Sequence, residues 1–232
     1  MINFSKPENQ ILHTTSFKNL INTPFQGDKN AICWDRELKG DFAEIVNKIK
    51  LEDDIMVINS DNLLELNLSE QGQIARETLL NDLKLLKEYG ASPTLNIIKC
   101  YERDDAFPFF PTDVYSFHVD RSPIPTHTFL CTYYGEPSEI VANTEARQKI
   151  LNPEIRTELK KIHSGSEDTF EEFLKEYFFD LHYETKPNAD IINLGVGNLW
   201  RLAVDHPKSK VLPCIHRAPQ EKDGKIRLLL IC

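Results

Sequence analysis

The spacing of apolar residues predicts helices in the first part of the chain. Between residues 41 and 89 apolar residues recur every three or four positions, which is the repeat of one helix face. Asp41 is a typical N-cap for a first helix that ends near Lys50. A second helix is expected over residues 69–89, because Gly90 then supplies a residue suited to ending it.

Beyond residue 93 the pattern changes to short runs of β-branched and aromatic residues between turn residues, which is typical of strands. Two helices are expected within this part, over residues 144–162 and 169–179. Pro153 would break the first helix, and Asp168 with Glu171 is the pattern of a capping box for the second. The expected strands are residues 94–101, 115–121, 127–134, 189–194, 199–204, 211–216 and 226–231, together with 31–34 and 54–59 nearer the N-terminus.

This succession of elements predicts a mainly β protein with flanking helices, that is, an α+β fold whose core is a barrel or a double-sheet jelly roll. Residues 94–232 would form the β core, with a helical insertion over about 143–187. Residues 1–93 would form a helical and mixed buttress of the same domain.

Composition narrows the class of protein. The chain has 232 residues and a net charge of −9, which argues against nucleic acid as the main partner because phosphate contacts need clustered Lys and Arg. Its five cysteines are scattered and contain no CxxC pair, as expected in a reducing cytoplasm. No apolar run approaches the roughly 20 residues that span a bilayer, and the N-terminus lacks the apolar core of a signal peptide. We therefore expect a cytoplasmic protein with no membrane partner.

The segment 115–121 carries the clearest candidate chemistry. In a strand, residues two apart point to the same face, roughly 6.6 Å apart along the chain. His118 and Asp120 would therefore project side by side, with Val119 pointing away. An imidazole and a carboxylate on one face can share a divalent metal, so the remaining question is whether the chain supplies a third ligand.

The last two expected strands supply the other candidate residues. His216 ends one strand and Arg227 begins the next, and a turn at residues 223–224 predicts that these strands are antiparallel neighbours. Both side chains could then open into one cavity. An arginine in an apolar strand is costly unless it meets an anion, and its planar fork suits a carboxylate. Two histidines and one carboxylate leave positions open on a metal, which is the arrangement of non-haem Fe(II) oxygenases.

Together, His118-Val119-Asp120, His216 and Arg227 resemble the His-x-Asp…His…Arg signature of the Fe(II)- and 2-oxoglutarate-dependent oxygenases. The resemblance covers roughly residues 94–232 and includes the segments 130–135 and 195–200. It implies a double-stranded β-helix, a variant of the jelly roll. It also implies that His118, Asp120 and His216 bind Fe(II), and that the co-substrate 2-oxoglutarate chelates the iron and pairs with Arg227. The substrate, a small molecule or a peptide, is not implied.

A second resemblance and two alternatives accompany this interpretation. The segments 117–120, 130–133, 216–219 and 227–230 also resemble a bacterial group of uncharacterised proteins, which suggests no substrate. The first alternative is a jelly-roll binding protein without turnover. The second is a zinc site that uses the same His, Asp and His ligands, although it leaves Arg227 without an evident role.

The other polar residues of this half of the chain have structural interpretations. His127, His163, His182 and His206 fit no ligand spacing with His118 and Asp120. Cys214 is expected to be a buried small hydrophobe. Core or rim packing is expected for Tyr101, Thr132 and Tyr134, with hydrogen bonding to the co-substrate as the alternative.

Overall fold

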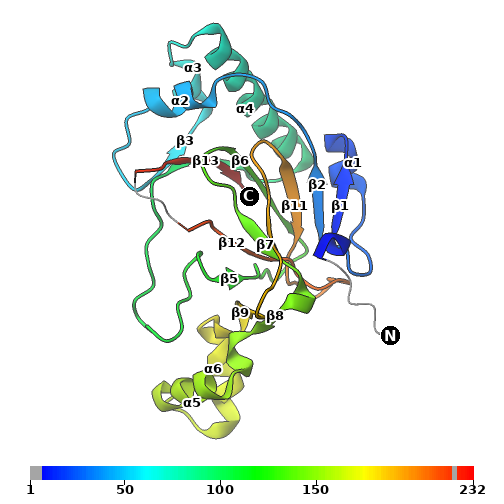
Figure 1. The fold of residues 1–232 in the computed structure, drawn as a ribbon, viewed down its shortest axis with the longest axis vertical. Helices are drawn as coiled ribbons and strands as arrows, with labels where there is room; N and C mark the ends of the chain where they lie inside the picture. The colour runs from blue at the N-terminus through cyan, green and yellow to red at the C-terminus, as the bar shows by residue number, and fades with distance from the viewer. Residues whose placement is uncertain (1–6, 221–223) are drawn as a thin grey trace.

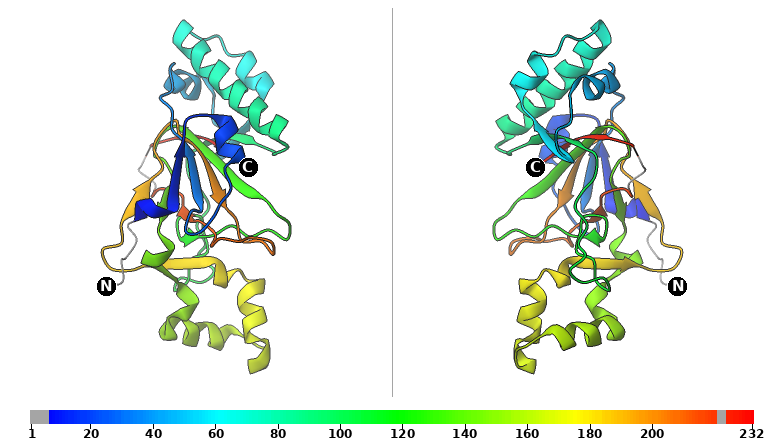
Figure 2. Two further views of the ribbon diagram at one scale, coloured as in Figure 1. Left: turned by 90° about the vertical axis from the view of Figure 1, so that its right-hand side faces the viewer. Right: turned by 90° about the vertical axis from the view of Figure 1, so that its left-hand side faces the viewer.

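The computed structural model describes residues 7–220 and 224–232, and it contains two β-sheets with helices at opposite ends of the molecule (Figures 1 and 2). The strands are β1 (Ile11–Thr14), β2 (Ala31–Trp34), β3 (Ile55–Ile58), β4 (Thr94–Ile98), β5 (Phe117–His118), β6 (His127–Tyr134), β7 (Glu139–Val141), β8 (Ala146–Gln148), β9 (His182–Thr185), β10 (Ile191–Asn193), β11 (Leu199–Ala203), β12 (Ile215–Arg217) and β13 (Arg227–Ile231). The α-helices are α1 (Phe17–Asn22), α2 (Phe42–Lys48), α3 (Ser60–Leu64), α4 (Glu70–Tyr89), α5 (Pro153–Ile162) and α6 (Phe170–Glu176). Short 3₁₀ turns lie at Pro7–Gln10, Asn143–Glu145, Lys149–Leu151, Glu167–Thr169 and Phe179–Leu181.

The first sheet has seven strands in the order β1-β2-β11-β6-β13-β4-β3, and the second has six in the order β10-β7-β12-β5-β9-β8. Apart from the parallel pair of β1 and β2, the neighbouring strands in these two orders are antiparallel. The expected combination of helices with a two-sheet β core is therefore confirmed, but helices make up at least as much of the chain as strands do, so the fold is mixed rather than mainly β.

The pairing of the strands from β4 onwards is nested. β4 pairs with β13, β5 with β12, β6 with β11, and β7 with β10. The chain therefore behaves as one long two-stranded ribbon that folds back between β7 and β10 and passes repeatedly from one sheet to the other. This pairing brings β5 and β12 side by side although almost a hundred residues separate them.

Strand β6 shows how the core is divided. Its alternate residues point to opposite faces of the seven-stranded sheet. Leu130 packs between the two sheets with residues such as Trp200, whereas Phe129, Cys131 and Tyr133 belong to the cluster beneath the helices. We call these two sides the inner face, which faces the six-stranded sheet, and the outer face, which α2 and α4 cover.

The helices on the outer face follow the sequence prediction. Asp41 caps α2 by accepting a hydrogen bond from the backbone N–H of Glu44. Ser69 caps α4, whose buried side includes Leu79 and Leu86. Gly90 ends α4 with a φ of 97°, a left-handed conformation that glycine adopts without steric penalty. Both helices thus begin and end close to where the pattern predicts.

The insertion differs from its prediction. Residues 146–148 form β8 rather than helix, and β8 pairs with β9, which the sequence pattern did not reveal. A regular helix begins only at Pro153, because proline suits the first turn of a helix but not its interior. The expected capping box is also wrong, since α6 begins after Thr169 without a side-chain cap.

The N-terminal part contributes strands as well as helices. β1 and β2 extend one edge of the seven-stranded sheet, and β3 forms its other edge. β1 was not predicted from the sequence. Residues 7–93 therefore continue the sheet of the β core in addition to covering its outer face, while residues 1–6 lie outside the described part of the chain.

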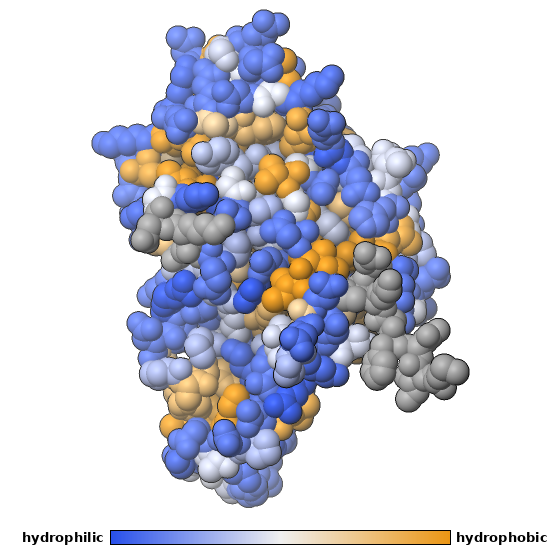
Figure 3. All heavy atoms as spheres, in the orientation of Figure 1, coloured by the Kyte–Doolittle hydropathy of each residue, from blue (hydrophilic) through white to orange (hydrophobic). Residues whose placement is uncertain are grey.

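No helix in the described part of the chain is long and apolar enough to cross a membrane. Figure 3 shows a face that is mostly hydrophilic, with apolar residues in separate smaller groups. Scattered groups of this kind are normal on protein surfaces.

Candidate metal centre

Three histidines lie in a row across neighbouring strands of the six-stranded sheet. His216 on β12 is the register partner of His118 on β5, and His118 is in turn the partner of His182 on β9. Directly opposed residues of antiparallel strands point to the same face. The ring centroids are 4.6 Å apart for His118 and His216 and 5.8 Å apart for His118 and His182. Ile140, the other register partner of His216, packs between the sheets, so the row faces the interior.

Asp120 joins this row from the segment that follows β5. The strand ladder ends at His118, earlier than predicted, but Val119 packs on the opposite face as expected. The backbone carbonyl of Asp120 accepts a hydrogen bond of 2.8 Å from the N–H of Asp205. Its carboxylate accepts a hydrogen bond from the Thr128 hydroxyl and lies 3.6 Å from Nε2 of His216. His118, Asp120 and His216 therefore meet, as the sequence predicts.

Backbone hydrogen bonds orient both imidazoles. Nδ1 of His118 lies 2.8 Å from the carbonyl oxygen of Ser116, and Nδ1 of His216 lies 3.2 Å from that of Cys214. Because a carbonyl only accepts hydrogen bonds, Nδ1 must carry the proton in each ring. Nε2 then has a free lone pair in the neutral imidazole. This tautomer, fixed by a hydrogen bond from the other nitrogen, is the one that metal-binding histidines use.

The protonation states of His118 and Asp120 suit the binding of a cation. Burial, followed by the nearby His216, lowers the pKa of the His118 imidazole to about 4. Burial opposes ionisation of the Asp120 carboxyl, but His216 and the Thr128 hydroxyl outweigh it and the pKa is lowered. At neutral pH the cluster thus contains a neutral His118 and an ionised Asp120, the protonation states that a metal ion requires.

The distances between the ligand atoms of His118, Asp120 and His216 are compatible with a shared metal ion after small side-chain movements. One ligand atom from each of His118, Asp120 and His216 lies within 4.8 Å of the others. A divalent ion about 2.1 Å from each ligand would hold neighbouring ligand atoms about 3 Å apart. Small side-chain rotations close that gap. Three protein ligands leave the remaining coordination positions for other molecules.

Arg227 lies at another place on the inner side of the seven-stranded sheet. It shares a face of β13 with Leu229, which packs between the sheets, and it is only 7 % exposed. Its Nη2 donates to Ser138 at 3.1 Å and approaches the Thr132 hydroxyl at 3.5 Å. Nε and Nη1 are buried and have no hydrogen-bond partner within residues 7–220 and 224–232. Burial lowers the pKa of this guanidinium, and the neighbouring Tyr101 phenol only partly opposes that effect.

The prediction that β12 and β13 are antiparallel neighbours is wrong. β12 lies between β5 and β7 in one sheet, whereas β13 lies between β4 and β6 in the other. The expected turn includes Asp223, which is outside the described residues. Leu228 and Leu230 are buried on the outer face and Leu229 on the inner one, so β13 needs partners and cover on both sides. A two-stranded hairpin with β12 would not provide them.

The inner side of β6 connects the two places. Thr128 donates to Asp120, and Thr132 contacts Arg227. Four residues of strand separate these two threonines, about 14 Å. The His118 cluster and the Arg227 guanidinium therefore lie toward opposite ends of one strip on the inner side of β6.

Sequence analysis missed His182 and Lys149. His182 is 5 % exposed, and its Nδ1 is buried without a hydrogen-bond partner. Nζ of Lys149 donates to the Ser116 hydroxyl at 2.6 Å and to the carbonyl of Pro111 at 3.3 Å. No local spacing indicates either residue, because the pairing of β5 with β9 places His182, and the pairing of β8 with β9 places Lys149, which follows β8.

The other polar residues fall outside the His118 cluster. Cys214 is fully buried, as predicted. Tyr134 is partly exposed, and Tyr101 lies near Arg227. Three further histidines contact residues elsewhere: His127 packs against Phe25, His163 against Thr169 and Phe170, and Nδ1 of His206 accepts from the N–H of Lys208.

Comparison with known proteins found no matching family model, no matching curated protein and no matching solved structure. The functional argument therefore rests on the chain's own residues and on their arrangement.

Proposed function

We propose that this chain is an Fe(II)- and 2-oxoglutarate-dependent oxygenase. His118, Asp120 and His216 would hold the iron, and Arg227 would bind the far carboxylate of 2-oxoglutarate. The observation that carries the proposal is the buried Arg227 guanidinium, whose Nε and Nη1 have no partner among the described residues and which lies on the same inner strip as the His118 cluster. A zinc site alone gives no reason for this arginine.

The topology supports the same proposal. Nested pairing of eight strands across two sheets, β4 with β13 through β7 with β10, is the connectivity of a double-stranded β-helix. We propose that β4–β7 and β10–β13 form that core. In this arrangement β5 and β12 carry the metal ligands and β13 carries the anion-binding arginine, in agreement with the family resemblance.

Each residue then has a defined task. Iron, 2-oxoglutarate and dioxygen together supply the oxidising power to hydroxylate a substrate C–H bond, with loss of carbon dioxide and formation of succinate. His118 and His216 present Nε2 lone pairs, and the Thr128 hydroxyl holds the Asp120 carboxylate in place. Arg227 orients the diacid through a charge-assisted, two-pronged contact. His216 is largely shielded from solvent, while the Asp120 side chain is 37 % exposed and marks the side on which a substrate would approach.

Anaerobic titration with Fe(II) and 2-oxoglutarate tests the metal and the co-substrate together. We expect a weak visible charge-transfer band that needs both components. His118→Ala and Asp120→Ala should abolish it, because each removes an iron ligand. His163→Ala is the matched control, since His163 lies in the insertion and contacts Thr169 rather than the cluster. If iron binding is unchanged in the first two variants, the assignment fails.

Arg227→Met separates the proposal from its alternatives. This variant should retain Fe(II) but bind 2-oxoglutarate much more weakly, since the carboxylate loses its charged partner. Release of succinate by the wild-type protein, with or without substrate, distinguishes an enzyme from a binding protein. A protein that is purified with zinc and does not gain 2-oxoglutarate turnover on replacement with Fe(II) is a zinc protein instead.

A further inference from the structure

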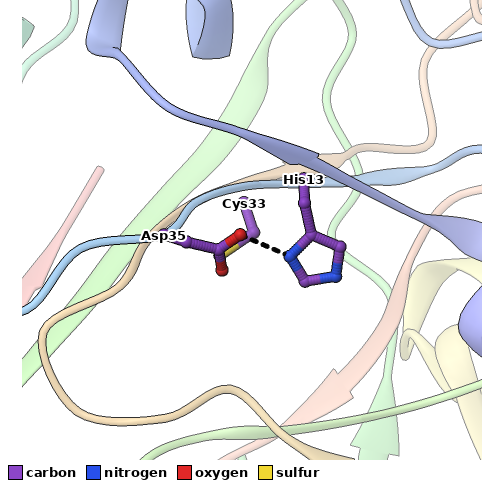
Figure 4. A group of neighbouring side chains, drawn as sticks. All are labelled: His13, Cys33 and Asp35. Carbon is purple, nitrogen blue, oxygen red and sulfur yellow. Dashed lines mark hydrogen bonds and ion pairs between the residues drawn. The ribbon is translucent and has the colours of Figure 1, made fainter.

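A second group of metal-ligating side chains lies at the N-terminal edge of the seven-stranded sheet. His13 on β1 and Cys33 on β2 are register partners, and Asp35 follows two residues after Cys33. Partners in adjacent strands, and residues two apart in one strand, point to the same side. The pairing of β1 with β2 therefore brings an imidazole, a thiol and a carboxylate together, as Figure 4 shows.

The three groups already contact one another. Nδ1 of His13 lies 2.7 Å from one carboxylate oxygen of Asp35, and the Cys33 thiol donates to the other oxygen at 3.1 Å. One ligand atom from each residue lies within 4.8 Å of the others. A tetrahedral zinc ion holds its ligand atoms roughly 3.3–3.8 Å apart. The three ligand atoms are thus nearly as close together as they would be around a zinc ion, and hydrogen bonds now join them.

The surroundings make this more than a surface ion pair. Cys33 is 0 % exposed, and its partner in β11, Trp200, is also buried and lies edge-on to the His13 ring. By contrast, the side chains of His13 and Asp35 are 60 % and 48 % exposed. The sulfur is therefore held rigidly at the base of the group, while the other two ligands face solvent and leave a path for an ion.

We propose that His13, Cys33 and Asp35 form a second metal site, separate from the His118 cluster, that binds Zn²⁺ with its fourth position open to water. Thiolate and imidazole ligands favour zinc over magnesium or calcium, which prefer oxygen ligands. Thiolate and carboxylate together balance the charge of the ion. Binding releases the Cys33 thiol proton to solvent, and the proton that Nδ1 of His13 donates to Asp35 leaves that nitrogen, so that the neutral ring carries its proton on Nε2 while Nδ1 coordinates the metal.

Cobalt titration of the metal-free, full-length protein tests this site independently of the proposed oxygenase. Co²⁺ bound by a thiolate gives an intense near-ultraviolet charge-transfer band, whereas the His118 cluster contains no thiolate. We expect one equivalent of Co²⁺ to produce the band and Zn²⁺ to remove it by displacement. Cys33→Ser should abolish it, and His13→Ala and Asp35→Asn should each weaken binding at least tenfold.

Two controls keep the result interpretable. Cys131→Ser changes another fully buried cysteine, on the outer face of β6, and should retain the band. His118→Ala should retain it too, so loss of the iron site and loss of this site are distinguished. His13 and Asp35 are exposed, so their variants test the site without disturbing the core. A wild-type protein without a thiolate band, or an unchanged Co²⁺ affinity in His13→Ala, overturns the proposal.

Discussion

On the outer face of the seven-stranded sheet, Arg36 and Asp82 are buried together beneath α4. Nη1 and Nη2 of Arg36 donate to the two carboxylate oxygens at 2.7 and 2.5 Å, and Nε donates to the carbonyl of Gly197 at 2.7 Å. The Tyr133 hydroxyl donates to the same carboxylate at 2.6 Å. Asp82 is 0 % exposed, and its charge is matched within the protein. This network joins the helix to the sheet and pairs the Arg36 charge with a carboxylate of the protein itself.

On the inner face, Arg227 is also buried, but in the part of the chain that the structure describes its Nε and Nη1 have no hydrogen-bond partner and thus no carboxylate. A buried charge without a partner destabilises the fold, so its presence needs another explanation. The contrast between the two arginines suggests one: Arg36 serves the architecture, and Arg227 serves an anion that comes from outside. Each prediction below tests one side of this contrast.

The largest effect is expected from Asp82→Ala. This change leaves the buried Arg36 without its carboxylate, which lowers the free energy of unfolding by about 3–5 kcal/mol. Metal binding by the fraction that remains folded should be unchanged, because the network lies on the outer face. Chemical denaturation and Fe(II) titration of the same samples measure both quantities. A loss of metal affinity without a loss of stability would contradict this separation of the two faces.

Thr128→Val should give the next largest effect, and on the metal rather than on the fold. Valine keeps the shape of threonine but cannot donate to Asp120, and such partners of metal ligands are typically worth 10–100-fold in affinity. Tyr133→Phe is the matched variant on the other face of β6. It should lower stability by about 1–3 kcal/mol, since it removes a donor to the buried Asp82, without affecting metal binding. Equal effects of both variants on the metal would contradict the prediction.

Arg227→Met should change the free energy of unfolding less than Asp82→Ala or Tyr133→Phe does. Replacing an unpaired buried charge by an apolar side chain relieves its desolvation, while the contacts with Ser138 and Thr132 are lost. We expect the two effects to offset one another to within about 1 kcal/mol in the absence of ligand. Denaturation curves of the ligand-free proteins provide the measurement. A destabilisation as large as that of Asp82→Ala would mean that Arg227 is structural.

The same contrast explains which features the sequence could predict. α4 and β6 have a complete periodic pattern, so both were predicted to within one residue at each end. The meeting of His118, Asp120 and His216 was predicted because His-x-Asp shares one face of a strand segment and the family resemblance supplied the third ligand. Iron and 2-oxoglutarate remain predictions.

The features that were missed depend on long-range pairing. β1, β8 and β9 are short, and each is defined by its partner rather than by its own pattern. The hairpin expected for β12 and β13 followed from local turn residues, whereas their burial on both faces decides the sheet to which they belong. His182 was set aside because no spacing relates it to His118, although the β5–β9 pairing places the two rings 5.8 Å apart.

In its hydrogen bonding, Arg201 on β11 is intermediate between Arg36, which is paired with a carboxylate, and Arg227, which is not. Its Nη1 donates to the carbonyl of Ile21 at 2.6 Å and its Nη2 to that of Thr23, while Nε has no partner. Neutral carbonyls leave the guanidinium charge uncompensated. His127 lies nearby and packs edge-on against Phe25, over which the Arg201 guanidinium also lies. Burial, followed by the charges of Arg201 and His206, lowers the pKa of His127 to about 4.

The smallest effect is therefore expected from His127→Gln and should be visible only in acid. Below the usual pKa of 6.5 the unfolded chain protonates His127, but the folded protein does not until about pH 4, so this residue removes stability as the pH falls through that window. Glutamine does not titrate, and the variant should lose less stability than the wild type between pH 7 and about pH 4.5. Denaturation midpoints at the two pH values measure the difference. An identical loss in both proteins would show that neither burial nor the Arg201 charge lowers the pKa of His127 in the folded protein.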